Sequence, residues 1–134
     1  MSPSKPLRIE APISAGELID KITILEIKTE RFGDLAKRQI AAKELALLLK
    51  IKDKSGLDTV QIASFADELR MINGALWDIE DAIRECEQRS DFGPRFIELA
   101  RSVYLTNDRR ALAKQRIDAT VGSDIVEQKS YWGM

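Results

Sequence analysis

The sequence contains no histidine and a single cysteine, Cys86, among its 134 residues. Without histidine, the chain cannot form Ser-His-Asp triads, Cys-His pairs, zinc sites with histidine ligands or di-metal bundles built on Glu-x-x-His. A single cysteine cannot form a disulfide within the chain, so we expect a buried, reduced thiol of the kind found in cytoplasmic proteins. The seven glycines are scattered, which gives no glycine-rich phosphate-binding loop.

Long hydrophobic segments are also lacking. No stretch approaches the roughly 20 apolar residues that a membrane-spanning helix needs, and residues 1–12 lack the apolar core of a signal peptide. The formal net charge of −1 argues against electrostatic binding to nucleic acid or to anionic membranes. We therefore expect a cytoplasmic protein with neither kind of partner. The length predicts one domain over residues 1–134.

The most regular feature of the sequence is one long heptad pattern. It predicts a single helix over about residues 59–89, roughly 45 Å long at 1.5 Å per residue. A helix of this length exceeds what one small core needs, so the other segments are expected to pack along part of it. The apolar residues of this seam recur at alternating steps of three and four: Ile62, Phe65, Leu69, Ile72, Leu76, Ile79, Ile83 and Cys86.

Capping signals predict three further helices. A capping box of Ser14 and Glu17 begins the first, and Pro94 begins the last. Gly33 and Gly122 are expected to end the first and the last helix in the left-handed conformation. The four predicted helices span residues 15–31, 35–52, 59–89 and 94–121.

The short connection before Pro94 predicts that the last two helices are antiparallel neighbours. The sequence therefore predicts an all-α fold: a four-helix antiparallel bundle built on a long helical hairpin. Three prolines within the first 12 residues predict an extended N-terminal arm. The C-terminal tail carries two aromatic residues, Tyr131 and Trp132, and is predicted to be non-helical and to dock on the bundle. Docking would bring Lys129 and Tyr131 near a functional surface.

The first predicted helix is apolar on two sides. Leu18 and Ile22 share one face, whereas Ile24 and Ile27 lie nearly opposite, so this helix is expected to lie between two partners. Asp20 lies among these residues and is a candidate buried carboxylate. It is either a site residue or a carboxylate paired with an arginine inside the bundle, and the second interpretation is favoured because a buried charge needs a partner.

Polar residues interrupt the apolar stripe of the last helix at Asn107, Arg110 and Lys114. If the hairpin closes near Phe92, Asn107 faces the region of Trp77, Tyr104 that of Glu80 and Arg101 that of Arg84. Polar breaks in the middle of an element are where function or strain tends to concentrate. One interpretation is a pocket for an anionic or sugar-like ligand, and the other is a satisfied network that fixes the register of the hairpin. The candidate pocket residues are Glu80, Asp81, Arg84, Arg101, Tyr104, Asn107, Asp108 and Arg109.

A carboxylate stripe runs along the long predicted helix through Asp78, Asp81 and Glu85. It is either a contact surface, a weak cation site or a solvated face on which Arg84 pairs with Glu80 four residues earlier. Three carboxylates without a precise motif are weak evidence for metal binding. We therefore expect no metal and no cofactor.

Four phrases of the sequence resemble a small bacterial family catalogued only as a domain of unknown function. They are ISAGELIDKITILEIK (13–28), LWDIEDAIRECE (76–87), DFGPRFIELARSVYLTNDRRA (91–111) and VEQKSY (126–131), and the resemblance covers most of the chain. It implies a cytoplasmic companion of genes for surface-polysaccharide synthesis or glycosyl transfer. It implies no catalytic residues.

Two functions remain open at this point. The favoured one is an interaction or accessory module that binds another protein or itself, because the seam is long and a catalytic set is lacking. The alternative is a small-molecule binder or enzyme that uses an Arg/Asp/Tyr pocket between the third and fourth predicted helices. The residues favour binding over enzymatic activity.

Overall fold

The computed structural model describes residues 5–128, which contain four α-helices and no β-strand. The helices are α1 (Ala15–Arg31), α2 (Leu35–Lys54), α3 (Val60–Gln88) and α4 (Pro94–Val121). The predicted all-α fold, with an extended arm before α1 and a non-helical segment after α4, is confirmed. The prediction that the tail docks on the bundle and reaches a functional surface concerns residues outside the described range: Lys129, Tyr131 and Trp132.

The helix ends follow local chemistry, with one exception. The Ser14 hydroxyl accepts a hydrogen bond from the Glu17 backbone N–H at 3.0 Å, and Gly122 ends α4 in the left-handed conformation at φ 69°. The prediction for Gly33 is wrong, because this glycine is not among the residues with positive φ. Instead, α1 ends at Phe32 in an extended conformation (φ −65°, ψ 127°), and the chain continues directly into the cap of α2.

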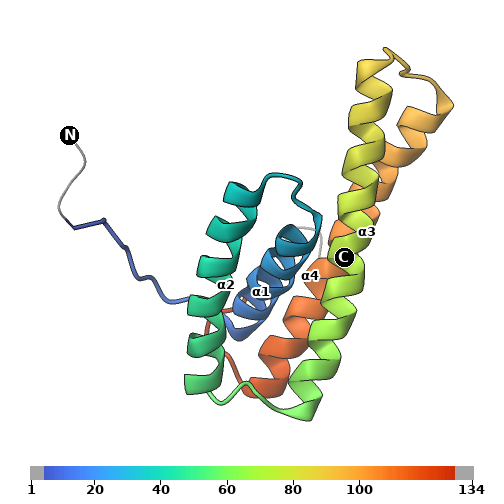
Figure 1. Ribbon diagram of the computed structural model, residues 1–134. Helices are drawn as coiled ribbons and strands as arrows, with labels where there is room; N and C mark the ends of the chain where they lie inside the picture. Colours follow the sequence, from blue (N-terminus) through green and yellow to red (C-terminus); the bar gives the residue numbers. More distant parts are fainter. Residues whose placement is uncertain (1–4, 129–134) are drawn as a thin grey trace.

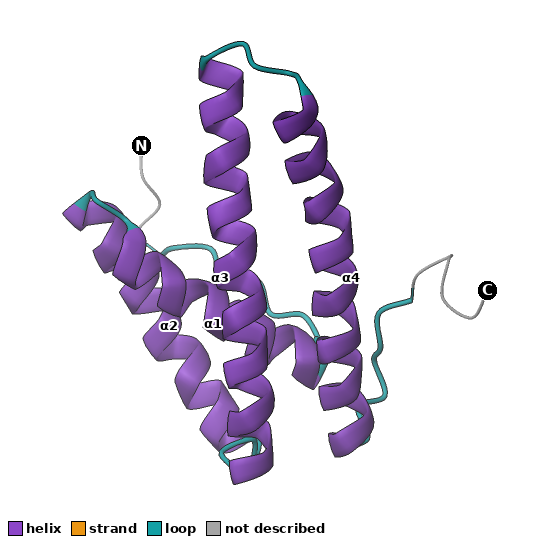
Figure 2. Ribbon diagram, turned by 90° about the vertical axis from the view of Figure 1, so that its right-hand side faces the viewer, coloured by secondary structure: helices purple, strands orange, loops and turns teal. Residues whose placement is uncertain are grey.

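The four helices form two hairpins of unequal length. Helices α3 and α4 run antiparallel, and the turn that joins them projects beyond α1 and α2 (Figures 1 and 2). Helix α1 packs against each of the other three helices, whereas α2 packs against α1. The prediction that the first helix lies between partners is confirmed.

The hydrophobic core lies where α1 crosses the longer hairpin. Helix α3 is unbroken and carries the whole predicted seam. Its first half is covered by both α1 and α4, so Leu69 is fully buried, while Ile79 and Ile83 farther along are half-buried. Cys86 is buried near the far end. The core cluster consists of Leu18, Ile19, Ile22, Leu57, Ile62, Leu69, Ile72, Ala113 and Ile117.

Polar contacts attach the beginning of α1 to α4. The buried carboxylate of Asp118 accepts a hydrogen bond from the Gly16 backbone N–H at 2.7 Å. Lys114 forms ion pairs with Glu17 at 2.9 Å and with Glu127, in the segment after α4, at 3.2 Å. Burial alone lowers the pKa of Lys114, but hydrogen bonds to these two carboxylates outweigh burial and raise the pKa above its ordinary value.

Gly16 offers a direct test of this close contact between α1 and α4. A β-carbon at position 16 would lie 2.3 Å from the backbone oxygen of Lys114, so Gly16→Ala forces the two backbones apart. We expect it to lower the free energy of unfolding by about 2 kcal/mol or more, measured by urea denaturation. The control is Gly33→Ala, where no atom lies within 4 Å of the new β-carbon; equal losses in both variants would contradict the packing described.

Candidate functional site

A buried ion pair lies where α1, α3 and α4 meet. Asp20, on α1, is fully buried, and the guanidinium of Arg110, on α4, binds it with two hydrogen bonds. Arg110 Nε donates to Oδ1 at 2.9 Å, and Nη2 donates to Oδ2 at 2.5 Å. This two-point geometry is the strongest form of the arginine–carboxylate interaction. The interpretation of Asp20 as a carboxylate paired with an arginine is confirmed.

Helix α3 contributes the third side of this network through Asn73. The amide nitrogen of Asn73 donates to Asp20 Oδ1 and to Thr23 Oγ1, both at 2.9 Å, and the Thr23 hydroxyl donates to the Asp20 backbone oxygen at 2.8 Å. The hydrogen bonds to Asp20 raise the pKa of Arg110 above its ordinary value. The guanidinium is therefore a permanent cation. Asp20 of α1 fixes its orientation, and Asn73 of α3 holds Asp20 in turn.

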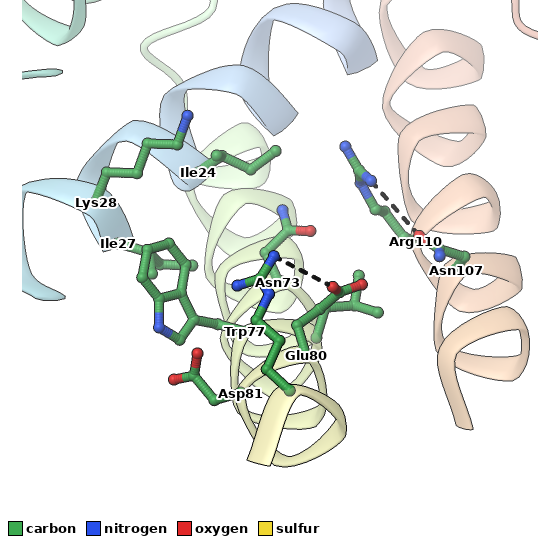
Figure 3. A pocket seen from close by; sticks show the side chains of 11 residues that line it. Ile24, Ile27, Lys28, Asn73, Trp77, Glu80, Asp81, Asn107 and Arg110 are labelled. Carbon is green, nitrogen blue, oxygen red and sulfur yellow. Dashed lines mark hydrogen bonds and ion pairs between the residues drawn. The ribbon is translucent and has the colours of Figure 1, made fainter. Parts of the chain in front are cut away.

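Next to this network, a groove of about 350 Å³ opens between α1, α3 and α4 (Figure 3). One part of its wall is apolar: Ile27 of α1 lies beside the indole of Trp77 of α3, and Ile24 of α1 lines the groove nearer α4. The ring of Phe32 contacts that indole, with the ring centroids 5.8 Å apart. The other lining residues are Lys28 of α1, then Asn73, Leu76, Glu80, Asp81 and Arg84 of α3, and Asn107 and Arg110 of α4.

The polar part of the wall presents donors and acceptors from two helices. Arg110 uses Nε and Nη2 on Asp20, while its remaining nitrogen, Nη1, lies 3.5 Å from the Asn107 side-chain oxygen (Figure 3). Across the groove, Arg84 and Glu80 form a long ion pair at 3.9 Å, and both side chains are substantially exposed. The contacts from Arg110 to Asn107 and from Arg84 to Glu80 are longer than an ordinary hydrogen bond, so these side chains retain donors and acceptors for a ligand.

The structure brings together four of the eight predicted pocket residues. Glu80, Asp81, Arg84 and Asn107 line the groove. The predicted proximity of Asn107 to Trp77 is confirmed, because both side chains line the same groove. The predicted pairing of Arg84 with Glu80 is also confirmed.

The other four predicted residues do not line this groove. Arg101 lies on the outer side of α4, where a hydrogen bond to Tyr104 raises its pKa. Tyr104 is itself half exposed, Arg109 is exposed, and Asp108 is half-buried. Arg101, Tyr104 and Asp108 share one side of α4, at steps of three and four residues, and Arg109 lies next to them. The groove residues Asn107 and Arg110 lie on the other side of the helix, so neither Arg101 nor Tyr104 lines the groove with Arg84 and Glu80.

Seven of the lining residues were not among the predicted pocket residues, and four of these are polar or aromatic: Arg110, Asn73, Trp77 and Lys28. Arg110 was visible in the sequence as one of the polar interruptions of the α4 stripe. Asn73 had a weaker signal: it is an uncharged polar residue immediately after the seam residue Ile72. No comparable signal marks Lys28 in the sequence.

The acidic stripe of α3 is divided among separate partners. Asp78 pairs with Arg31 at 2.6 Å, and Glu85 pairs with Arg89 at 2.7 Å. Within residues 5–128, no group of three or more cysteine or carboxylate side chains is arranged to hold a metal ion. None of the described helices has the length and apolar character required to cross a lipid bilayer.

Comparison with known families shows which family the chain belongs to. Residues 8–133 match the family described as "Family of unknown function (DUF6165)". The chain belongs to this family. The DUF6165 match spans all four helices and every residue of the groove, and it confirms the resemblance to a domain of unknown function. Searches among curated proteins and among solved structures gave no match.

The buried network predicts a large effect of Asp20→Asn on stability. The substitution removes the charge that faces Arg110 and places an amide donor against existing donors, so we expect the free energy of unfolding to fall by about 3 kcal/mol. Chemical denaturation measures the loss. The matched control is Asp78→Asn, which breaks the exposed pair with Arg31 and is expected to cost about 1 kcal/mol or less. Similar losses in the two variants would contradict the central role of Asp20.

Proposed function

We propose that the groove binds a small, hydroxyl-rich anionic molecule of the sugar or sugar-acid class. The observation that carries this proposal is that Asp20 occupies only two of the three nitrogens of the Arg110 guanidinium. Two of its nitrogens bind the buried Asp20, and the third lies at the groove wall beside Asn107. A guanidinium held in place beforehand loses little conformational entropy when it binds an anion.

The rest of the groove suits the chemistry of such a ligand. The indole of Trp77 offers a flat apolar surface on which the C–H face of a sugar ring can lie. Glu80 and Asp81 can accept hydrogen bonds from hydroxyl groups, and the amide of Asn107 can both donate and accept. Lys28 adds a second cation at the α1 side. Apolar walls with a few converging polar groups are typical of small-molecule sites.

We propose binding rather than covalent catalysis. None of the described residues that line the groove has a hydroxyl or thiol nucleophile. We assign its carboxylates, Glu80 and Asp81, to hydrogen bonding with the ligand. A sugar-like ligand is consistent with the cytoplasmic accessory role in surface-polysaccharide synthesis that the family resemblance implies. That role is part of the proposal.

A protein-interaction role is the second candidate function. The observation that favours it is the exposed apolar surface on the outer side of α4, where Ile97 is 56% exposed and Leu105 is 53% exposed. Large exposed apolar groups near one another commonly mark contact surfaces for proteins. They lie on the hairpin that extends beyond α1 and α2.

Ligand binding can be followed through Trp77. In a Trp132→Phe background, Trp77 is the only tryptophan of the chain, so its fluorescence reports on the groove. Titration with uronic acids and sugar phosphates is expected to change this fluorescence saturably. Neutral parent sugars are expected to bind about tenfold more weakly or worse, because each lacks the charge that Arg110 recognises.

Two single variants locate the binding site. Asn107→Ala removes a groove amide and is expected to weaken binding about tenfold, the effect of losing one hydrogen bond to a polar ligand. Arg101→Ala removes an arginine from the outer side of α4 and is expected to leave the affinity unchanged. Equal effects of the two variants, or no saturable response to any of the anions, would refute the proposal.

A further inference from the structure

The outer face of α4 carries a stripe of residues that no helix of the bundle covers. The residues of this stripe follow one another at steps of four, four, three and four, which places them along one side of the helix. They are Ile97, Arg101, Leu105, Asp108 and Leu112. Among the aliphatic members, Ile97 is 56%, Leu105 53% and Leu112 44% exposed. In Figure 2 the side of α4 turned away from α3 has no further helix against it. The stripe is about 22 Å long at 1.5 Å per residue.

Two copies of this stripe are complementary to each other when the helices run antiparallel. When two copies of α4 lie antiparallel so that paired residue numbers add to 209, Ile97 of one copy meets Leu112 of the other. Arg101 then meets Asp108, and Tyr104 meets Leu105 at the centre. Each pair occurs twice, as two-fold symmetry requires. Apolar groups therefore meet apolar groups, and opposite charges meet each other.

We propose that this face of α4 is the contact surface of a homodimer, in which α4 packs antiparallel against α4 of a second copy in that register. The inference makes the interaction-module proposal specific by naming the partner, and it does not depend on ligand binding in the groove. The shallow depression between Ile97, Arg101 and Leu105 receives Leu112 of the second copy. Asp108 also interacts within its own chain, but its two carboxylate oxygens can accept several hydrogen bonds.

Charge and apolar pattern favour this register over the alternatives. A parallel pairing places Arg101 against Arg101 and Asp108 against Asp108, which is repulsive. An antiparallel pairing shifted by one heptad in either direction brings one of the same two like-charged pairs together. Among these arrangements, the register that sums to 209 alone combines the apolar contacts with both charge pairs.

Cysteine cross-linking tests the register. Leu105 lies beside the proposed two-fold axis, so Leu105→Cys is expected to form a covalent dimer under mild oxidation, while the native Cys86 is buried. The control is Ala119→Cys, which is exposed on the same stripe. In the proposed dimer the two copies of residue 119 lie about 43 Å apart along the helix axis, so they are not expected to cross-link. Equal cross-linking of the two variants would overturn the register.

Light scattering on the full chain tests the dimer itself. The wild type is expected to show twice the chain mass of 15.1 kDa. Arg101→Asp places two like charges together and is expected to give the monomer mass, whereas Arg101→Asp with Asp108→Arg restores the opposite charges and the dimer. Circular dichroism verifies that each variant is helical. A monomeric wild type, or a double variant that stays monomeric, overturns the inference, and the groove proposal is judged separately by the fluorescence titration.

Discussion

The ion pair between Asp20 and Arg110 fixes how the two hairpins sit on each other. A carboxylate with no exposed surface is costly unless its oxygens are satisfied, and here they accept three hydrogen bonds from two other helices. A rotation of α1 about its axis, or a shift of one turn along α3, would leave that charge buried without partners. The apolar core contributes most of the driving force for association, whereas this network selects one arrangement among many that bury similar apolar surface.

The groove results from the unequal lengths of the helices. Helix α1 has 17 residues, whereas α3 has 29 and α4 has 28, so α1 can cover only part of the longer hairpin. The covered part is the core, and the uncovered part is a two-helix extension with half-buried seam residues. The groove lies at the boundary between them, where Ile24, Ile27 and Lys28 form one wall and the middle of α3 forms the other. The polar interruption of α4 lies at this boundary. Apolar side chains at these positions would be only partly buried, because α1 does not cover them completely.

The positions of the four helices could be predicted from the sequence because the signals that begin and end a helix are local. The heptad seam, the Ser14 cap and Pro94 act within a few residues of the structure they specify, and the helix bounds agree with expectation to within two residues. Gly33 shows the limit of such rules, since an extended Phe32 ends α1 instead. A helix stop can be satisfied in more than one way, and here an extended Phe32 leads within two residues to the Asp34 cap of α2.

The site was only half predictable because its geometry depends on contacts between distant segments. The proximity of Asn107 to Trp77 could be predicted, since pairing within one hairpin follows from the position of its turn. Whether the polar break forms a groove or a closed network could not. The partner of Asp20 lies 90 residues away, and its choice depends on how α1 crosses the hairpin. No local pattern specifies that crossing. Arg101 and Arg110 lie on opposite sides of α4. The sequence placed Arg110 on the interrupted apolar stripe, but the predicted pocket included Arg101 and omitted Arg110.

The energetics of the buried pair also bear on why it is present. Buried ion pairs can often be replaced by apolar residues of similar volume without loss of stability, so the stability of the bundle alone gives little reason for an arginine at position 110. An apolar pair could fill the same space, but it could not place a fixed cation at the wall of the groove. The arginine does both, because Asp20 occupies two of its nitrogens and leaves the third beside Asn107. In the function that we propose, the interaction that orients the helices also holds the cation that recognises the anionic ligand.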